Sequence, residues 1–244
     1  MKRLIQALFV CLILTSCFTT KQATTTPRIP VKFDFSPPSR SQAGSAGMTI
    51  ALIRPIYLTE APENYIQPFP EMATAMANDI EESLTAKGFR IRGAFRSRDE
   101  MVYSDKENSD FALNIEIDLQ PNYARRYKYD AGLGALKPAS YKMSGEITLG
   151  GNLVLTASSS RSGEKIWKKN IALDKQTFSY IGTLKWNAVP TVADELNQDN
   201  GFFNQFTKEL EKFYNTALQL AWQQIEVIEM KSVAEQAKKA DKRQ

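Results

Sequence analysis

The densest group of side chains able to bind a ligand lies in residues 123–129, Tyr-Ala-Arg-Arg-Tyr-Lys-Tyr, where three cations are interleaved with three tyrosines. Aromatic faces suit the C–H groups of a sugar ring, and Arg binds carboxylate or phosphate through two parallel hydrogen bonds. This run is the best candidate for a glycan or lipid-headgroup site. Its ligand-binding residues would be Tyr123, Arg125, Arg126, Tyr127, Lys128 and Tyr129. The alternative interpretation is a solvated, charged loop that covers a sheet edge.

A second group of cations, Arg90, Arg92, Arg96 and Arg98, falls on one side of a predicted strand if that strand stays extended. Such a stripe could bind a carboxylate or a phosphate. The strand expected at 111–119 carries Glu116 and Asp118 on its polar face, and cross-strand pairs with these acids would neutralise the stripe. A structural role for the four arginines is therefore favoured.

The first seventeen residues indicate an export signal. Two basic residues precede an apolar run at 4–14, about half the 20 residues needed to cross a bilayer, so a cleaved signal is predicted rather than a span. The stretch Leu14-Thr-Ser-Cys17 resembles the bacterial lipobox, in which cleavage precedes an acylated Cys. Two or more acyl chains anchor a protein firmly. Cys17 is the predicted lipid attachment, and Phe18, where an Asp commonly signals inner-membrane retention, favours the outer membrane.

The residues needed for common catalytic chemistry are missing. The chain has no His, and its two cysteines are Cys11, inside the predicted signal, and Cys17. Ser-His-Asp catalysis, Cys-His catalysis and the usual N/S zinc sites are thereby excluded. The neighbouring Glu81 and Glu82 point in different directions on a helix and form no acid–base pair. We expect no enzyme activity, catalytic residue, cofactor or metal site.

The length and net charge of the chain are those of an ordinary folded domain. Removal of 16 of the 244 residues leaves 228, enough for a hydrophobic core. The formal charge of +4 falls to +2 when Lys2 and Arg3 leave with the signal, so nucleic acid is not an expected partner. The predicted organisation is a signal peptide at 1–16, a lipidated Thr-rich tether at 17–29, an α/β domain at 30–230 and a charged C-terminal extension at 231–244, expected to be solvated.

Periodic patterns predict the elements of the domain. Strands are expected at 31–36, 48–54, 89–96, 111–119, 147–155 and 165–173, and helices at 70–87 and from 203 to about 230. Gly150-Gly151 is expected to form a bulge or bend. Residues 122–142 are expected to form a long loop, and residues 174–200 to be irregular.

The order of these elements predicts the fold class. The segments 48–54, 70–87 and 89–96 form a β-α-β unit. Because only two long apolar-striped helices serve one sheet, both should lie on the same face. We expect a single α/β (α+β) domain, with a mixed β-sheet of about six strands and two long helices packed on one face.

Several short stretches of the chain appear in this same order in a known family. They are Ile50-Ala-Leu-Ile-Arg-Pro55, Leu84-Thr-Ala-Lys-Gly-Phe-Arg-Ile91, Leu119-Gln-Pro121, Lys142-Met-Ser-Gly145 and Ser162-Gly-Glu164. With this order of segments, from about Val31 to the charged C-terminus, the chain resembles the Helicobacter neuraminyllactose-binding hemagglutinin family.

The resemblance implies a lipoprotein of the outer membrane or of the flagellar sheath, regarded as an adhesin for sialylated glycans. The family's proposed sialic-acid motif is a basic run shortly after the Leu-x-Pro end of a strand. Arg125 falls at its Arg, whereas Arg126, Tyr127 and Lys128 depart from the pattern.

Two functions remain open. The first is an outer-membrane-anchored adhesin for sialylated host glycans, or a flagellar-sheath component, whose partners are the lipid bilayer, through acylated Cys17, and the glycan. The second is a structural or assembly lipoprotein that docks on an envelope or flagellar protein without binding glycans. A carboxylate-based glycosidase would require two acidic residues across a cleft.

Overall fold

The computed structural model describes residues 26–134, 139–184 and 189–243, so the predicted signal peptide and Cys17 lie outside the described residues. In chain order, the elements are β1 Thr49–Ile53, β2 Ile56–Tyr57, the 3-10 helix η1 Pro62–Tyr65, α2 Phe69–Ala86, β3 Arg90–Phe95, the 3-10 helix η2 Arg98–Glu100, α3 Tyr103–Glu107, β4 Phe111–Leu119, β5 Asn122–Asp130, β6 Ser140–Ser158, β7 Lys165–Leu184, α4 Val192–Gln198, α5 Asn200–Gln224 and α6 Val227–Asp241.

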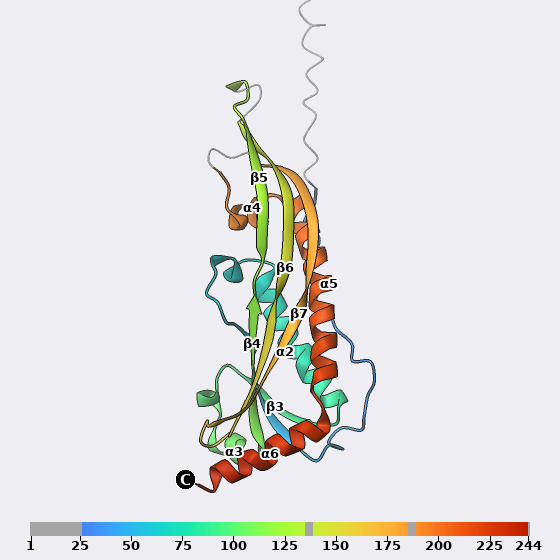
Figure 1. Cartoon of the computed structure of the whole chain (residues 1–244), viewed down its shortest axis with the longest axis vertical. Helices are drawn as coiled ribbons and strands as arrows, with labels where there is room; N and C mark the ends of the chain where they lie inside the picture. The colour runs from blue at the N-terminus through green and yellow to red at the C-terminus, as the bar shows by residue number, and fades with distance from the viewer. Residues whose placement is uncertain (1–25, 135–138, 185–188, 244) are drawn as a thin grey trace, which may run out of the picture.

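The molecule is elongated, and the β6–β7 hairpin runs along its length (Figure 1). Helix α4 lies toward one end and helix α6 lies across the other. These are called the α4 end and the α6 end below.

The predicted β-α-β unit is present. Strand β1 pairs in parallel with β3, and α2 connects them. Pro70 fits the first turn of α2, and Gly88, with φ of 91°, follows the helix in a left-handed conformation that glycine adopts readily. The helix buries the predicted apolar stripe, including Met76 and Leu84.

The sheet has seven strands in the described part of the chain. Strand β4 lies parallel to β1 and antiparallel to β6, and the short β2 pairs with β4. The bounds of β4 agree with the period-two prediction, and its inward residues Phe111, Leu113 and Ile115 are fully buried.

Strands β6 and β7 are about twice as long as the sequence predicts, at 19 and 20 residues. One half of β6 pairs with β4, and its other half pairs with β5, while β7 follows β6 throughout. The long loop expected at 122–142 is therefore wrong for residues 122–130 and 140–142, and the irregular segment expected at 174–200 is wrong for the rest of β7 and for α4.

Gly150 and Gly151 lie where the partner of β6 changes from β4 to β5. The register between β6 and β7 shifts between Leu149 and Gly151, which confirms the expected bulge. Gly151 has φ of 143°, and a Cβ atom on it would lie 1.9 Å from the Asp118 carbonyl oxygen. Only glycine fits this position without a shift of the backbone.

Helices α2 and α5 pack against the same face of the sheet and contact each other. Their buried residues, such as Leu84 and Phe206, share one core with the inward residues of β4. The opposite face carries a smaller buried cluster of Ala51, Ile53, Met101 and Ala112. The predicted fold class, a mixed sheet with two long helices on one face, is confirmed.

The predicted C-terminal helix divides in two at Ile225 and Glu226. Residues 227–241 form α6, which crosses the end of the sheet (Figure 1). Met230, Val233 and Ala237 are buried in the core, so most of the segment expected to be a solvated extension is part of the fold.

Residues 31–36 form no strand, contrary to the prediction. The Phe35 amide donates to the Asp79 carboxylate at 2.9 Å, and the Phe33 ring lies 5.1 Å from the Tyr214 ring. The alternation of apolar residues here therefore reflects packing on helices α2 and α5 rather than pairing in a sheet.

The end of the expected tether is also bound to the domain. The Arg28 guanidinium donates to the Leu196 carbonyl at 2.5 Å and lies 3.9 Å above the Phe203 ring. Asn200 donates to the Thr26 carbonyl at 2.9 Å. The docked segment includes Thr26, so the boundary expected at residue 29 is too late.

Candidate functional site

The six predicted site residues lie on β5, and the alternation of the strand divides them between two faces of the sheet. Tyr123, Arg125 and Tyr127 point toward the helices, in the rows of the inward residues Ile147, Gly145 and Met143 of β6. Arg126 and Lys128 are exposed on the opposite face. The structure therefore brings together only half of the predicted set at one place.

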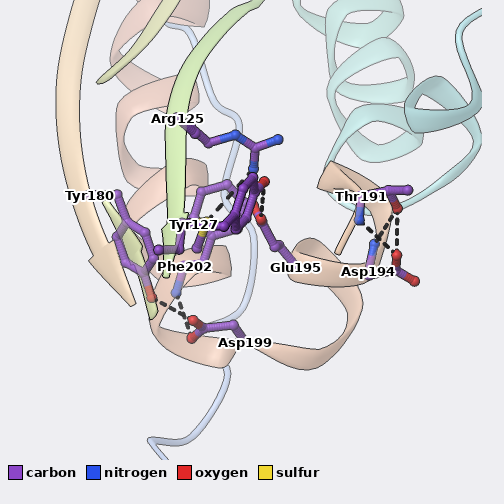
Figure 2. A network of polar contacts seen from close by, with 9 residues as sticks. Arg125, Tyr127, Tyr180, Thr191, Asp194, Glu195, Asp199 and Phe202 are labelled. Carbon is purple, nitrogen blue, oxygen red and sulfur yellow. Dashed lines mark hydrogen bonds and ion pairs between the residues drawn. The ribbon is translucent and has the colours of Figure 1, made fainter. Parts of the chain in front are cut away.

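Arg125 makes an ion pair with Glu195 of α4, and both side chains are buried (Figure 2). Their exposed fractions are 10% for Arg125 and 0% for Glu195. The Tyr127 hydroxyl donates to the other Glu195 oxygen at 2.9 Å, and the Arg125 guanidinium lies 4.9 Å from the Tyr123 ring centroid. The guanidinium predicted to hold a ligand carboxylate thus holds a carboxylate of the same chain.

Helix α4 positions Glu195 through its own end contacts. Thr191 and Asp194 form a capping box: the Thr191 hydroxyl accepts from the Asp194 amide, and the Asp194 carboxylate accepts from the Thr191 amide at 2.8 Å. Asp199 then caps α5 by accepting from the Phe202 amide, and it also accepts from the Tyr180 hydroxyl of β7 at 2.7 Å. Figure 2 shows these contacts as one polar network between strands and helices.

Burial sets the protonation behaviour of this network. It raises the pKa of the Glu195 carboxyl above its ordinary value, although Arg125 and the Tyr127 hydroxyl act in the opposite direction. Burial, aided by Glu195, also raises the pKa of Tyr127 to about 12. Tyr127 therefore stays a hydrogen-bond donor at neutral pH. We interpret the cluster as a clamp that holds α4 against β5, since the Glu195 carboxylate accepts from both Arg125 and Tyr127. The buried Arg125 Nε and Tyr123 hydroxyl have no hydrogen-bond partner among the described residues.

The remaining three predicted residues are accessible. Arg126 and Lys128 stand beside Ser144 and Lys142 of β6 on the face that carries no long helix. The Tyr129 ring, half exposed, packs 5.0 Å from the Tyr141 ring. These are the side chains of the predicted site that an external ligand can reach.

The arginine stripe predicted after the first helix has different partners from those expected. Strand β1 lies between β3 and β4, so the expected cross-strand pairs with Glu116 and Asp118 are absent in the described structure. Arg92 instead forms an ion pair with Asp105 of α3 at 3.1 Å. Arg92 therefore has the structural role that the sequence favours.

Sequence reasoning missed Glu195 and the contacts of α4. The pattern Thr191-x-x-Asp194 is a helix-start signal that could have identified the helix. No local signal identifies Glu195 as inward, because its partner Arg125 lies 70 positions away in the chain.

The described residues contain no group of three or more His, Cys, Asp or Glu side chains placed to hold a metal ion. Within the same residues, no helix combines the length and apolar character needed to span a membrane.

The comparisons with known proteins bear on the fold of the chain. No family model matches the sequence, and no curated protein matches it significantly. The chain is similar in fold to a solved protein described as a neuraminyllactose-binding hemagglutinin homolog from Helicobacter pylori. The TM-score is 0.58 at 15% identity, over 86% of this chain and 100% of that one. The resemblance expected from the sequence is confirmed at the level of the fold.

Two solved lipoproteins are more distant. One, from Neisseria meningitidis, matches with a TM-score of 0.28 and 12% identity over 66% of this chain and 99% of that one. The other, from Acinetobacter baumannii, matches with a TM-score of 0.26 and 12% identity over 72% and 91%. These scores are too low to support a comparison of folds.

Proposed function

We propose that the chain is an outer-membrane-anchored lipoprotein, acylated at Cys17, that binds sialylated glycans at the cell surface. The observation that carries the proposal is the similarity of fold to the Helicobacter pylori hemagglutinin homolog over 86% of the chain. The lipobox-like sequence at Cys17 supports the anchor. The contacts of the described residues make the proposal specific enough to test.

The α4 end is the end that would face the membrane. Thr26, which is bound to α5 at that end, follows Cys17 by nine residues. Nine residues span about 30 Å when fully extended. An acylated Cys17 would therefore hold the α4 end near the headgroups and direct the α6 end away from the bilayer.

Within the predicted site, the ligand contacts belong to Arg126 and Lys128, because these side chains are exposed on one face of the sheet. They supply the cations for a sugar carboxylate. Tyr129 is also exposed, but it lies in the row of Tyr127 on the other face. Arg125, with its two inward tyrosines, holds the strand in position.

Binding of sialyllactose to the mature chain tests the function. The protein is residues 17–244 with Cys17→Ser, which keeps every described residue without the lipid. Arg126→Ala together with Lys128→Ala should weaken sialyllactose binding at least about tenfold, since each removed cation ends a charge-assisted contact. Lactose, which has no carboxylate, and the variant Lys175→Ala are the controls. The absence of sialyllactose binding by the unchanged protein would refute glycan recognition.

Surface exposure tests the location and the alternative function. Radioactive palmitate should label the wild-type protein in cells but not the Cys17→Ala variant. Protease added to intact cells should digest the domain if it acts as an adhesin. Protection of the domain would instead favour the structural or assembly role on an envelope or flagellar complex.

A further inference from the structure

A cavity of about 310 Å³ lies toward the α6 end, on the sheet face opposite the long helices. It is formed by β1, β2, β4 and β6 together with the segment after β3, the turn between β6 and β7 and the first residue of β7. This size is at the lower end of the range for small-molecule sites, about 300–1,000 Å³. None of the six residues of the predicted site contributes to it.

The inner surfaces of the cavity combine apolar and hydroxyl-bearing side chains. Ile53 and Ile56 supply apolar surface, and Ile56 is half exposed although it is a large hydrophobic residue. Asn114, Thr156 and Ser158 supply polar groups from the neighbouring strands β4 and β6. An apolar patch beside a few convergent polar groups is typical of a site for a small hydroxylated molecule.

Three cations border the same cavity: Arg96, Arg98 and Lys165. Arg98 is held in place because it donates to the Arg161 carbonyl at 2.6 Å, yet it makes no ion pair in the described part of the chain. The Lys165 side chain has no hydrogen bond or ion pair among the described residues.

Two acids close to lining residues in the sequence have partners of their own. The Glu100 carboxylate accepts from the Arg96 amide at 2.6 Å and lies 3.7 Å from the Arg96 guanidinium. Glu116, outside the cavity wall, accepts from the Asn114 amide group at 3.4 Å. Two cations, Arg98 and Lys165, thus face the cavity without a carboxylate partner in the described structure.

We propose that this cavity binds a small organic anion with a hydroxylated body, namely a sugar acid or a sugar phosphate. The anionic group contacts Lys165 and Arg98, the hydroxyls contact Thr156, Ser158 and Asn114, and the ring C–H groups lie on the isoleucines. The proposal goes beyond glycan recognition at β5 and does not depend on it. The site lies on the part of the molecule that an anchored protein would hold farthest from the membrane.

A titration of the ¹⁵N-labelled mature chain, residues 17–244 with Cys17→Ser, tests the cavity. The probes are glucuronate and glucose 6-phosphate, with glucose as the neutral control. We expect one or both anions to shift the amide signals of Asn114, Thr156 and Ser158, while glucose leaves them unchanged. A response to glucuronate alone identifies a carboxylate site, and a response to glucose 6-phosphate alone identifies a phosphate site.

Variants separate the cavity from general electrostatic attraction. Arg98→Ala with Lys165→Ala should weaken binding of the responding anion at least about tenfold, because charge-assisted contacts are lost. Lys175→Ala, which removes an exposed cation farther along β7, should change the affinity for that anion less than about twofold. Equal weakening by both variants, or the absence of amide shifts with either anion, would overturn the proposal.

The same experiment distinguishes this site from the one on β5. If Arg126→Ala with Lys128→Ala abolishes sialyllactose binding but leaves the cavity titration unchanged, both proposals stand. If the cavity signals respond to the anions while the unchanged protein fails to bind sialyllactose, the cavity stands and the glycan function fails.

Discussion

The α4 end and the α6 end hold their cations in opposite ways. At the α4 end, Arg125 is nearly buried and paired with the fully buried Glu195. At the α6 end, Arg98 and Lys165 border a cavity and have no carboxylate partner within the described residues. A basic run in the sequence therefore does not by itself identify a binding site. The location of the nearest carboxylate decides whether a cation stabilises the fold or is free for a ligand.

The largest effect expected from this difference is the loss of stability in Arg125→Ala. Removal of one partner from a buried ion pair leaves an uncompensated charge, which costs about 3–5 kcal/mol of the free energy of unfolding. Urea denaturation measures this loss. Arg126→Ala, one position along the same strand but exposed, should change the free energy by less than about 0.5 kcal/mol.

A paired substitution strengthens that test. Arg125→Met together with Glu195→Leu removes both charges and fills the space with apolar atoms, so it should recover most of the lost stability. A loss below about 1 kcal/mol in Arg125→Ala, with no recovery in the double variant, would show that the pair is not a clamp.

The second largest effect concerns the bend at which β6 passes from one end of the molecule to the other. Gly151→Ala should lower the free energy of unfolding by about 2 kcal/mol or more, because its φ is left-handed and its Cβ would meet the Asp118 carbonyl oxygen. Gly150→Ala is the matched control, since its Cβ would meet only the Lys175 side chain, at 3.2 Å. Equal losses in the two variants would argue against a special role for Gly151.

The regularity of the pattern decided which elements could be predicted. The strand β4 could be predicted with its bounds because large apolar residues occupy every second position from Phe111 to Leu119. The strand β5 was missed because Arg125 occupies an inward position where an apolar residue was expected. Its tyrosines at 123, 127 and 129 do alternate, and tyrosine is common in strands, so a weaker signal was present.

The site was predicted less well than the fold, for a reason of distance along the chain. The role of Arg125 depends on Glu195, and the cavity at the α6 end depends on strands and turns from four parts of the sequence. Pairing over such separations leaves no periodic pattern. Only the arrangement of the strands brings these residues together.

A smaller effect is expected where the N-terminal segment joins the α4 end. Arg28→Ala removes a hydrogen bond to the Leu196 carbonyl and the contact with the Phe203 ring, so stability should fall by about 1 kcal/mol. Lys32→Ala, an exposed cation of the same segment, should have no measurable effect. Thermal unfolding of the two variants compares them directly, and an unchanged melting temperature in Arg28→Ala would mean that this segment is not fixed by Arg28.

The smallest effect is the contribution that Glu195, at the α4 end, makes to the dependence of stability on pH. Burial raises the pKa of the Glu195 carboxyl in the folded state. The folded protein therefore binds the carboxyl proton more tightly than the unfolded chain, in which a Glu carboxyl has a pKa of about 4.3. Protonated Glu195 therefore stabilises the fold, and this stabilisation is fully present at pH values below the pKa of Glu in the unfolded chain. It is lost as the pH rises through the higher pKa that Glu195 has in the folded state. Urea denaturation from about pH 4 to about pH 8 should therefore show a decline that is reduced in Glu195→Gln.

For this variant, the change in the free energy of unfolding with pH is compared, not its absolute value. The absolute value is also affected because Glu195→Gln alters the contact with Arg125. Burial raises the pKa of Asp79 as well, and that carboxyl contributes a decline of the same sign in both proteins. The difference between wild type and variant isolates Glu195. Lys165→Ala, at the α6 end, should leave the wild-type decline unchanged, and an identical decline in Glu195→Gln would show that folding does not shift the pKa of Glu195.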